Sequence, residues 1–137
     1  MVVPENEAVV RRFMNELWSD GNLDAADELV AINHVHHLGD EELHGPDGLK
    51  GAVSWLRSAF PDLRFEIDDV VSDGDRVVLR WTATGTHDGT FADVAPTGRR
   101  VAWNGCDWFR LHAGQLTEAF VVADGGALYE QLTSSET

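Results

Sequence analysis

Two carboxylates share one face at the last predicted strand, which runs from Gln115 to Ala123. Asp124 and Glu118 have the same strand parity, and the rest of that face is apolar, consisting of Leu116, Phe120 and Val122. If the face lines a cavity, desolvation favours the neutral carboxyl and raises its pKa towards useful proton transfer. Asp124 could then take an activated α-proton and return it to an alkoxide, while Glu118 orients a donor. Two structural alternatives stay open: Asp124 starts an Asp-Gly-Gly turn, and Glu118 faces solvent or a second subunit.

The strand predicted over residues 100–111 carries one acid among apolar neighbours. Asp107 shares its parity with Val101, Trp103, Gly105 and Phe109. An acid in this setting is expected to be buried and hydrogen-bonded, either on a pocket wall or against water or a second subunit. Aromatic side chains could line the same pocket for a flat ligand, or could be plain core. The candidates for such walls are Trp18, Phe60, Trp81 and Phe120.

Three histidines lie close together in a polar stretch over residues 33–42. In an extended chain His34 and His36 share a face, as some metal ligands do. No cysteine pair or His-Glu helix motif accompanies them, so no metal site is expected. A histidine titrates near neutrality and could donate to a substrate oxygen, although all three could equally be exposed loop residues.

Composition narrows the class of protein. The 137 residues fit a single domain over residues 1–137. The net charge of -14, from 24 acids against 10 bases, repels phosphate backbones and anionic membranes, so neither nucleic acid nor a membrane is expected as a partner. Cys106 is the only cysteine, which excludes an intrachain disulfide and fits a cytoplasmic location. No stretch resembles a signal peptide or a membrane span.

Hydrophobic periodicity places these residues on an α+β architecture. Helical spacing predicts an amphipathic helix over 5–19, a short helix capped by Asn22, and a third helix that opens at Gly45-Pro46 and ends before Pro61. From residue 63 the period changes to two, which predicts four antiparallel strands and a short terminal helix. A curved antiparallel sheet wrapped around helices can leave a pocket at its open end.

The order of several motifs resembles the SnoaL-like polyketide cyclases, also called predicted ester cyclases, of the nuclear transport factor 2-like superfamily. The matching segments are Trp81 to His87, Pro96 to Val101, Asp107 to Arg110, and Glu118, Asp124 and Gln131-Leu132 at the end. The resemblance implies a cone-shaped fold, with three N-terminal helices packed on a curved antiparallel sheet that encloses a pocket. It also implies a cofactor-free enzyme, usually a homodimer, in which Asp124 acts as general acid–base and His37 faces the pocket.

The expected activity is that of a cyclase or isomerase acting on a hydrophobic, oxygenated small molecule such as a polyketide ester. Epoxide hydrolysis, for which Arg80 would supply the electrophile, or dehydration is an alternative, and a non-catalytic binding module is another. The last strand departs from the family pattern, since Ala119, Val121 and Ala123 stand where larger or polar groups are usual. These changes leave the identity of the substrate, and catalysis itself, open.

Overall fold

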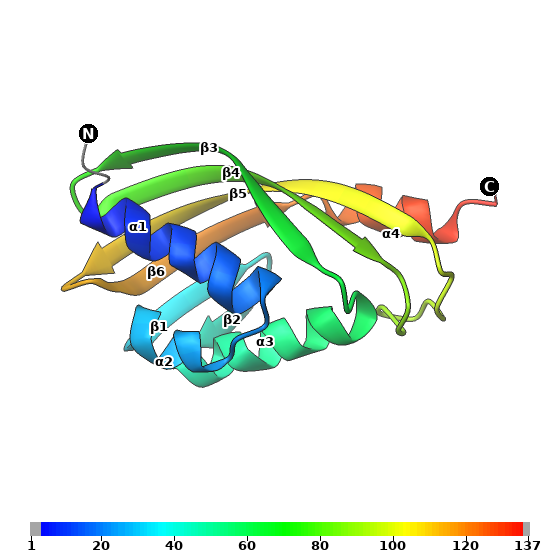
Figure 1. Cartoon of the computed structure of the whole chain (residues 1–137), viewed down its shortest axis with the longest axis horizontal. Helices are drawn as coiled ribbons and strands as arrows, with labels where there is room; N and C mark the ends of the chain where they lie inside the picture. The colour runs from blue at the N-terminus through cyan, green and yellow to red at the C-terminus, as the bar shows by residue number, and fades with distance from the viewer. Residues whose placement is uncertain (1–3, 136–137) are drawn as a thin grey trace.

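Six strands form one curved sheet in the computed structural model, which describes residues 4–135 (Figure 1). The strand order is β2-β1-β6-β5-β4-β3. The bounds are Val30–Leu38 for β1, Glu41–His44 for β2, Arg64–Asp73 for β3, Arg76–Thr86 for β4, Arg100–His112 for β5 and Gln115–Ala123 for β6. The sheet arches over the helices of the first half of the chain, which cover its concave side. The α+β, cone-shaped fold that the sequence predicts is confirmed, while the predicted domain of residues 1–137 extends beyond the described range at both ends.

The helices follow the predicted periodicity, with one change in geometry. α1 (Glu5–Arg12) continues into a π-helix, η1 (Phe13–Ser19), where the sequence predicts one α-helix over 5–19. The backbone N–H of Asp20 bonds to the carbonyl of Asn15, five residues back, which is π-helical spacing. The remaining helices are α2 (Asp24–Leu29), α3 (Gly45–Ala59) and α4 (Gly125–Thr133).

The four long strands, β3 to β6, are antiparallel neighbours as predicted. Their inward side chains alternate with outward ones, and in β4 the side chains on one face are buried: Val77, Leu79, Trp81 and Ala83. The apolar faces of α1, η1 and α3 pack against this concave surface, which creates the hydrophobic core.

Two strands were not predicted. The histidine-rich stretch is not a loop: β1 pairs with β2 in antiparallel fashion and with β6 in parallel fashion. The parallel pairing is possible because α3 and four strands separate β1 from β6 in the chain. A register irregularity in β1 lies between Val30 and Val35, a span that includes His34, and both His34 and His36 are turned inwards.

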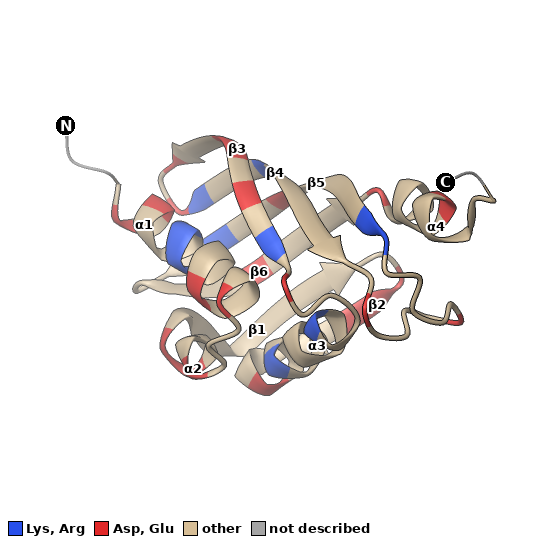
Figure 2. Ribbon diagram, turned by 45° about the vertical axis from the view of Figure 1, so that its right-hand side comes forward, with Lys and Arg blue, Asp and Glu red and all other residues tan. Residues whose placement is uncertain are grey.

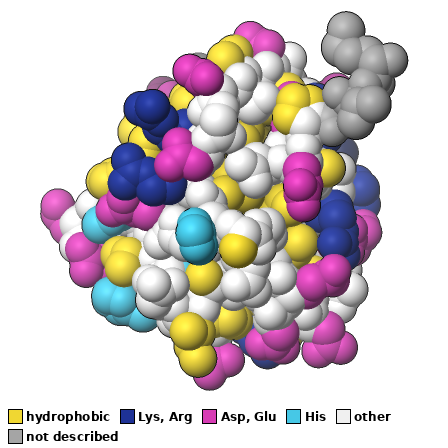
Figure 3. All heavy atoms as spheres, turned by 90° about the vertical axis from the view of Figure 1, so that its left-hand side faces the viewer, with side chains coloured by type: hydrophobic (Ala, Val, Ile, Leu, Met, Phe, Trp, Pro, Cys, Tyr) yellow, Lys and Arg dark blue, Asp and Glu magenta, His cyan; other side chains and the backbone are white. Residues whose placement is uncertain are grey.

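Charged residues lie on the outer surfaces of the helices and strands (Figure 2). On the face in Figure 3, acidic and basic side chains lie beside each other, with hydrophobic side chains scattered among them. Within residues 4–135, no helix has the length and apolar character needed to cross a bilayer.

Candidate active site

An apolar cavity of about 220 Å³ lies between the concave face of the sheet and the helices. The strands contribute His36, Leu38, Phe65, Trp81, Trp103, Asp107, Val121 and Ala123, and the helices and loops contribute Met14, Trp18, Ala52, Trp55, Leu56, Phe91, Gly125 and Leu128. Trp55, Ala123 and Gly125 are exposed and therefore mark the mouth. Among these lining residues only Asp107 and His36 have titratable side chains, and none is Lys or Arg.

Asp107 is the only acid on the cavity wall, and it is 4% exposed. Its Oδ1 accepts a hydrogen bond of 2.8 Å from the indole Nε1 of Trp81. Burial raises the pKa of Asp107 to about 7, and the bond from Trp81 offsets part of that rise. No hydrogen bond from the described residues reaches Oδ2, so this oxygen is free for a ligand. A carboxyl with these properties can both take and return a proton near neutral pH.

Gly105 makes the contact between Trp81 and Asp107 possible. Trp81 and Gly105 are opposite each other in the β4–β5 register, and Asp107 is two residues further along β5. A Cβ built on Gly105 would be 2.1 Å from Cζ2 of Trp81. The missing side chain therefore leaves the space in which the indole lies across β5 and reaches the carboxylate.

His36 brings a second polar group to the cavity. Its Nδ1 is 3.1 Å from Nε2 of His34, which is fully buried behind it. Burial lowers the pKa of His36 to about 3 and that of His34 to about 4, so both rings are neutral at pH 7. The ring of His36 also packs against Phe13, with the centroids 6.0 Å apart.

The π-helix forms the wall of the cavity that faces the sheet. Met14 and Trp18 belong to η1, are buried and line the cavity. The guanidinium of Arg57 fixes the end of this helix, because Nη1 donates to the carbonyls of Trp18, Ser19 and Leu63. π-Helical turns are frequent at functional sites, which fits this placement.

Comparisons with known proteins show the family of this chain. The sequence profile of the SnoaL-like polyketide cyclases matches residues 8–132. The chain belongs to the SnoaL-like polyketide cyclase family. It is 27% identical over 128 residues to the aklanonic acid methyl ester cyclase DnrD of Streptomyces peucetius, which covers 90% of this chain and 88% of the relative.

Two solved structures have the same fold. A candidate SnoaL-like polyketide cyclase from Jannaschia sp. CCS1 superposes with a TM-score of 0.89 at 25% identity, over 99% of each chain. AclR of Streptomyces galilaeus, a candidate hydroxylase, superposes with a TM-score of 0.85 at 30% identity, over 99% of this chain and 85% of its own. The family supports a cyclase or isomerase role, and AclR illustrates that one fold carries different chemistries.

Within this SnoaL-like fold, three of the predicted pocket residues come together. Trp18, Trp81 and Asp107 all line the cavity. Phe60 does not: it is fully buried in the core, where its ring centroid is 5.3 Å from that of Trp103. Phe60 therefore supports a cavity wall from behind instead of touching a ligand.

Asp124 is placed differently from the sequence-based expectation. It is exposed, and its Oδ1 accepts a bond of 2.9 Å from the backbone N–H of Ala127, which caps α4. The parity argument was wrong because β6 carries an extra residue: Arg110 pairs with Glu118 but Leu111 pairs with Leu116. This bulge reverses the faces of the strand beyond it. Asp124 is next to the mouth without lining the cavity, and its catalytic role stays a prediction.

Three other candidates lie on the convex face: Glu118 and Phe120 beyond the same bulge in β6, and His37 on β1. His37 stacks on Phe120, with ring centroids 4.3 Å apart, and its Nε2 is 3.2 Å from a carboxylate oxygen of Glu118. Phe120 is 46% exposed. His37, Glu118 and Phe120 therefore do not line the cavity, and their roles stay predictions, whereas His36, the neighbour of His37 in the chain, occupies the inward position. The shared face of His34 and His36, expected for an extended chain, is confirmed.

Arg80 does not reach the cavity either. It is exposed and lies 3.9 Å from Asp68 on the outer face, where it borders a shallow hollow together with Asp124. Within residues 4–135, no group of three or more His, Cys, Asp or Glu side chains could hold a metal ion.

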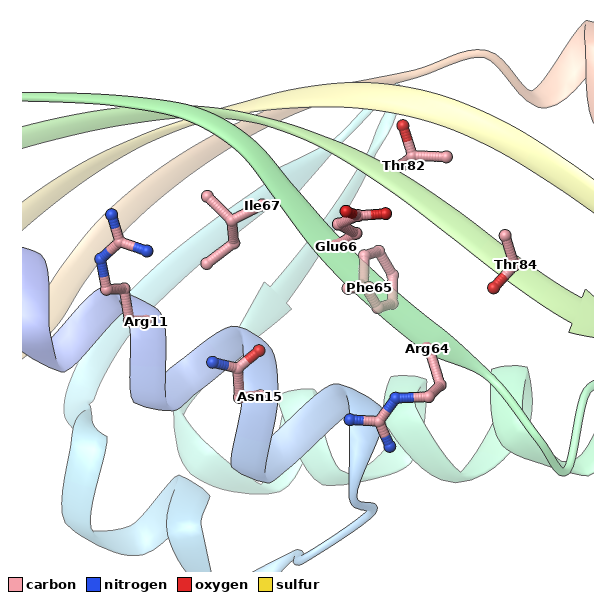
Figure 4. Close-up of a pocket in the computed structure, with 8 residues that line it drawn as sticks. All are labelled: Arg11, Asn15, Arg64, Phe65, Glu66, Ile67, Thr82 and Thr84. Carbon is pink, nitrogen blue, oxygen red and sulfur yellow. The ribbon is translucent and has the colours of Figure 1, made fainter.

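A larger, open hollow of about 510 Å³ lies beside the edge strand β3 (Figure 4). Its lining is mostly polar and comes from α1, η1, β3 and β4. Both of its arginines already have acidic partners, Arg11 with Glu7 and Arg64 with Asp20. It contains no buried titratable group, so the apolar cavity is the better candidate for an active site.

Proposed function

We propose that this SnoaL-like protein is a cofactor-independent enzyme that cyclises or isomerises a hydrophobic, oxygenated small molecule by acid–base aldol chemistry. The observation that carries the proposal is the buried carboxyl of Asp107, which has a pKa of about 7 on the wall of an apolar cavity. Perturbed carboxyls in apolar pockets are typical of general acids and bases.

In the proposed reaction, Oδ2 of ionised Asp107 removes a proton from the carbon between two carbonyl groups. The enolate then attacks a second carbonyl carbon of the same molecule, so that a carbon–carbon bond forms and the carbonyl oxygen becomes an alkoxide. The protonated Asp107 returns its proton to that alkoxide, which regenerates the carboxylate. The hydrogen bond from Trp81 stabilises the ionised form and occupies Oδ1, so Oδ2 is the oxygen that transfers the proton.

The surroundings support this chemistry over epoxide hydrolysis. Epoxide opening on this fold would use an arginine that converges with acids, whereas no arginine lines the cavity among the described residues and Arg80 is on the outer face. Proton abstraction next to a carbonyl needs only a base of suitable pKa and a dry environment.

The test measures how fast the α-hydrogens of ethyl benzoylacetate, a one-ring β-keto ester, exchange with solvent deuterium. Proton NMR follows this exchange, and the uncatalysed rate is subtracted from the rate with enzyme. Asp107→Asn should lower the catalysed rate about 100-fold or more, because a general base contributes roughly 10²–10⁴-fold. Asp124→Asn is the matched control, since it removes the carboxylate next to the mouth. Full exchange by Asp107→Asn, or its loss in Asp124→Asn alone, would contradict the assignment.

A further inference from the structure

The groups on the sheet side of the cavity follow a fixed order along the strands. Asp107 of β5 pairs with Val121 of β6, and Ala123, two residues further on, is the last residue of β6. His36 of β1 lies on the other side of Asp107, because it pairs with Ala119, two residues before Val121. His36 is buried and Ala123 is exposed. The cavity therefore runs from a closed end at His36, past Asp107, to its mouth at Ala123.

The helix side of the mouth is aromatic. Trp55 of α3 lines the cavity and is 56% exposed, and its ring centroid is 5.2 Å from that of the half-buried Phe91. Phe91 is held by two backbone hydrogen bonds with Val94, one in each direction, and by the ring of Phe60, whose centroid is 5.5 Å away. Trp55 and Phe91 therefore form a continuous aromatic wall that begins inside the cavity and ends in solvent.

The sheet side of the mouth carries almost no side-chain volume. Ala123 and Gly125 lie there, and no atom beyond its chain neighbours is within 4 Å of a Cβ built on Gly125. Among the large exposed hydrophobic side chains of residues 4–135, Trp55 alone lines the cavity. An indole on one side and small residues on the other leave a slot that suits a flat apolar group, since aromatic faces stack on flat rings.

The volume of the cavity indicates that such a group lies partly outside it. At about 220 Å³, the cavity is smaller than the ~300–1,000 Å³ of pockets that enclose drug-sized ligands. A ligand that reaches Asp107 and carries more than one ring must therefore extend through the mouth, along Trp55. No Lys or Arg lines the cavity, so a carboxylate there would stay unpaired, and a neutral ester or ketone is favoured.

We propose that Trp55 and Phe91 form an outer subsite for the flat apolar ring of the substrate, while its dicarbonyl group lies deeper, beside Asp107. The substrate class is a neutral β-keto ester or β-diketone that enters with the dicarbonyl end first and keeps its distal ring against the indole at the mouth. The placement of the dicarbonyl group rests on the proposed function, whereas the contact of the ring with Trp55 does not. Trp55 is thus a specificity-determining residue that binds the part of the substrate remote from the reacting carbon.

Calorimetric titration with two esters tests this subsite. Ethyl benzoylacetate and ethyl 3-(2-naphthyl)-3-oxopropanoate differ by one fused ring. Wild type should bind the naphthyl ester about five- to tenfold more tightly, because stacking of one more ring on an aromatic side chain has an effect of this size. In Trp55→Ala the preference should fall below about twofold, whereas Trp55→Phe, which keeps a flat ring, should retain a preference above about threefold.

Trp108→Ala is the matched control for the titration. It removes an indole that packs against Phe120 on the convex face and does not line the cavity, so it should keep the preference of wild type. Thermal unfolding checks that each variant is folded. An equal preference in folded Trp55→Ala and wild type would overturn the subsite.

Nuclear Overhauser contacts give the orientation of the bound naphthyl ester. The indole N–H signal of Trp55 is assigned from its disappearance in Trp55→Phe. We expect contacts between the naphthyl hydrogens and the indole of Trp55, and none between the naphthyl ring and His36. A naphthyl ring in contact with His36 at the closed end, without contact to Trp55, would mean that the ligand enters ring first and would overturn the proposal.

Failure of the outer subsite and failure of the proposed reaction have different signatures. Loss of exchange in Asp107→Asn together with an unchanged ring preference in Trp55→Ala would support the reaction and overturn the subsite. Full exchange in Asp107→Asn together with the expected ring preference and ring contacts would support the subsite and overturn the reaction.

Discussion

Trp81 and Asp107 are joined by a hydrogen bond of 2.8 Å that connects neighbouring strands inside an otherwise apolar cavity. The indole N–H stabilises the ionised carboxyl, while burial of the same carboxyl stabilises its neutral form more strongly. The two opposed effects bring the pKa of Asp107 to about 7, so that both protonation states are present near neutral pH.

Replacing Trp81 should change the pH dependence of exchange. Trp81→Phe removes the donor and keeps an aromatic wall, so the pKa of Asp107 should rise above about 7. In a plot of the deuterium-exchange rate against pH, the limb that requires the ionised carboxylate should then move to higher pH. Trp55→Phe at the mouth is the control and should leave this limb in place. An unshifted limb in Trp81→Phe would mean that the indole does not tune the carboxyl.

Adding one methyl group at Gly105 should displace the indole. In Gly105→Ala the new Cβ would be 2.1 Å from Cζ2 of Trp81, so the ring or the strand must move. We expect a loss of about 1–3 kcal/mol in the free energy of unfolding, measured in urea, because overpacking has this cost. Gly125→Ala is the matched control, since no atom lies within 4 Å of its added Cβ. Equal stability of the two variants would contradict the close approach.

Asp107 should make the protein less stable as the pH rises. Its folded pKa of about 7 is above the ordinary value of 3.8, so the folded state binds more protons between these values. Wild type should therefore lose stability from about pH 4 to pH 7 relative to Asp107→Asn, by about 4 kcal/mol at most, since one unit corresponds to about 1.36 kcal/mol. Thermal unfolding of both proteins across this range measures the difference. Parallel curves would show an ordinary carboxyl.

The buried histidines should act in the opposite direction. Their folded pKa values, about 4 for His34 and about 3 for His36, are below the ordinary 6.5, so the unfolded state binds more protons in that window. Stability should fall as the pH drops from 6.5 towards 3. The double variant His34→Gln/His36→Gln should have a flatter curve of stability against pH, whereas the exposed His44→Gln should follow wild type. A double variant with the slope of wild type would mean that the two rings are accessible to protons.

The periodic segments of this chain were predictable because their apolar side chains recur at the regular spacing of a helix or a strand. The alternation in β3 and β4 and the apolar stripe of α3 need no information beyond local sequence. Asp107 was recognisable for the same reason, as one acid on an apolar face. The strand β1 escaped prediction because its pairing partner β6 is about 80 residues away, and polar histidines hide its inward face.

One extra residue in β6 caused most of the errors in the predicted positions of the site residues. The bulge in β6 exchanges the inner and outer faces after Leu116, so a parity count that starts there places Glu118, Phe120 and Asp124 on the wrong side. The small inward residues Ala119, Val121 and Ala123 belong to the concave side, where Val121 and Ala123 line the cavity. No local signal marks the bulge, because it arises from how β5 and β6 pair.

The sheet order also affects how the chain is made. β1 and β2 leave the ribosome early, but the partner on the other side of β1 is β6, the last strand. At about 5–20 residues per second, the ~80 residues between them take roughly 4–16 s to synthesise. During that interval the early strands have an unpaired edge that other chains could join. The cavity is closed only when β6 docks beside β1, so ligand binding first becomes possible once β6 has been synthesised.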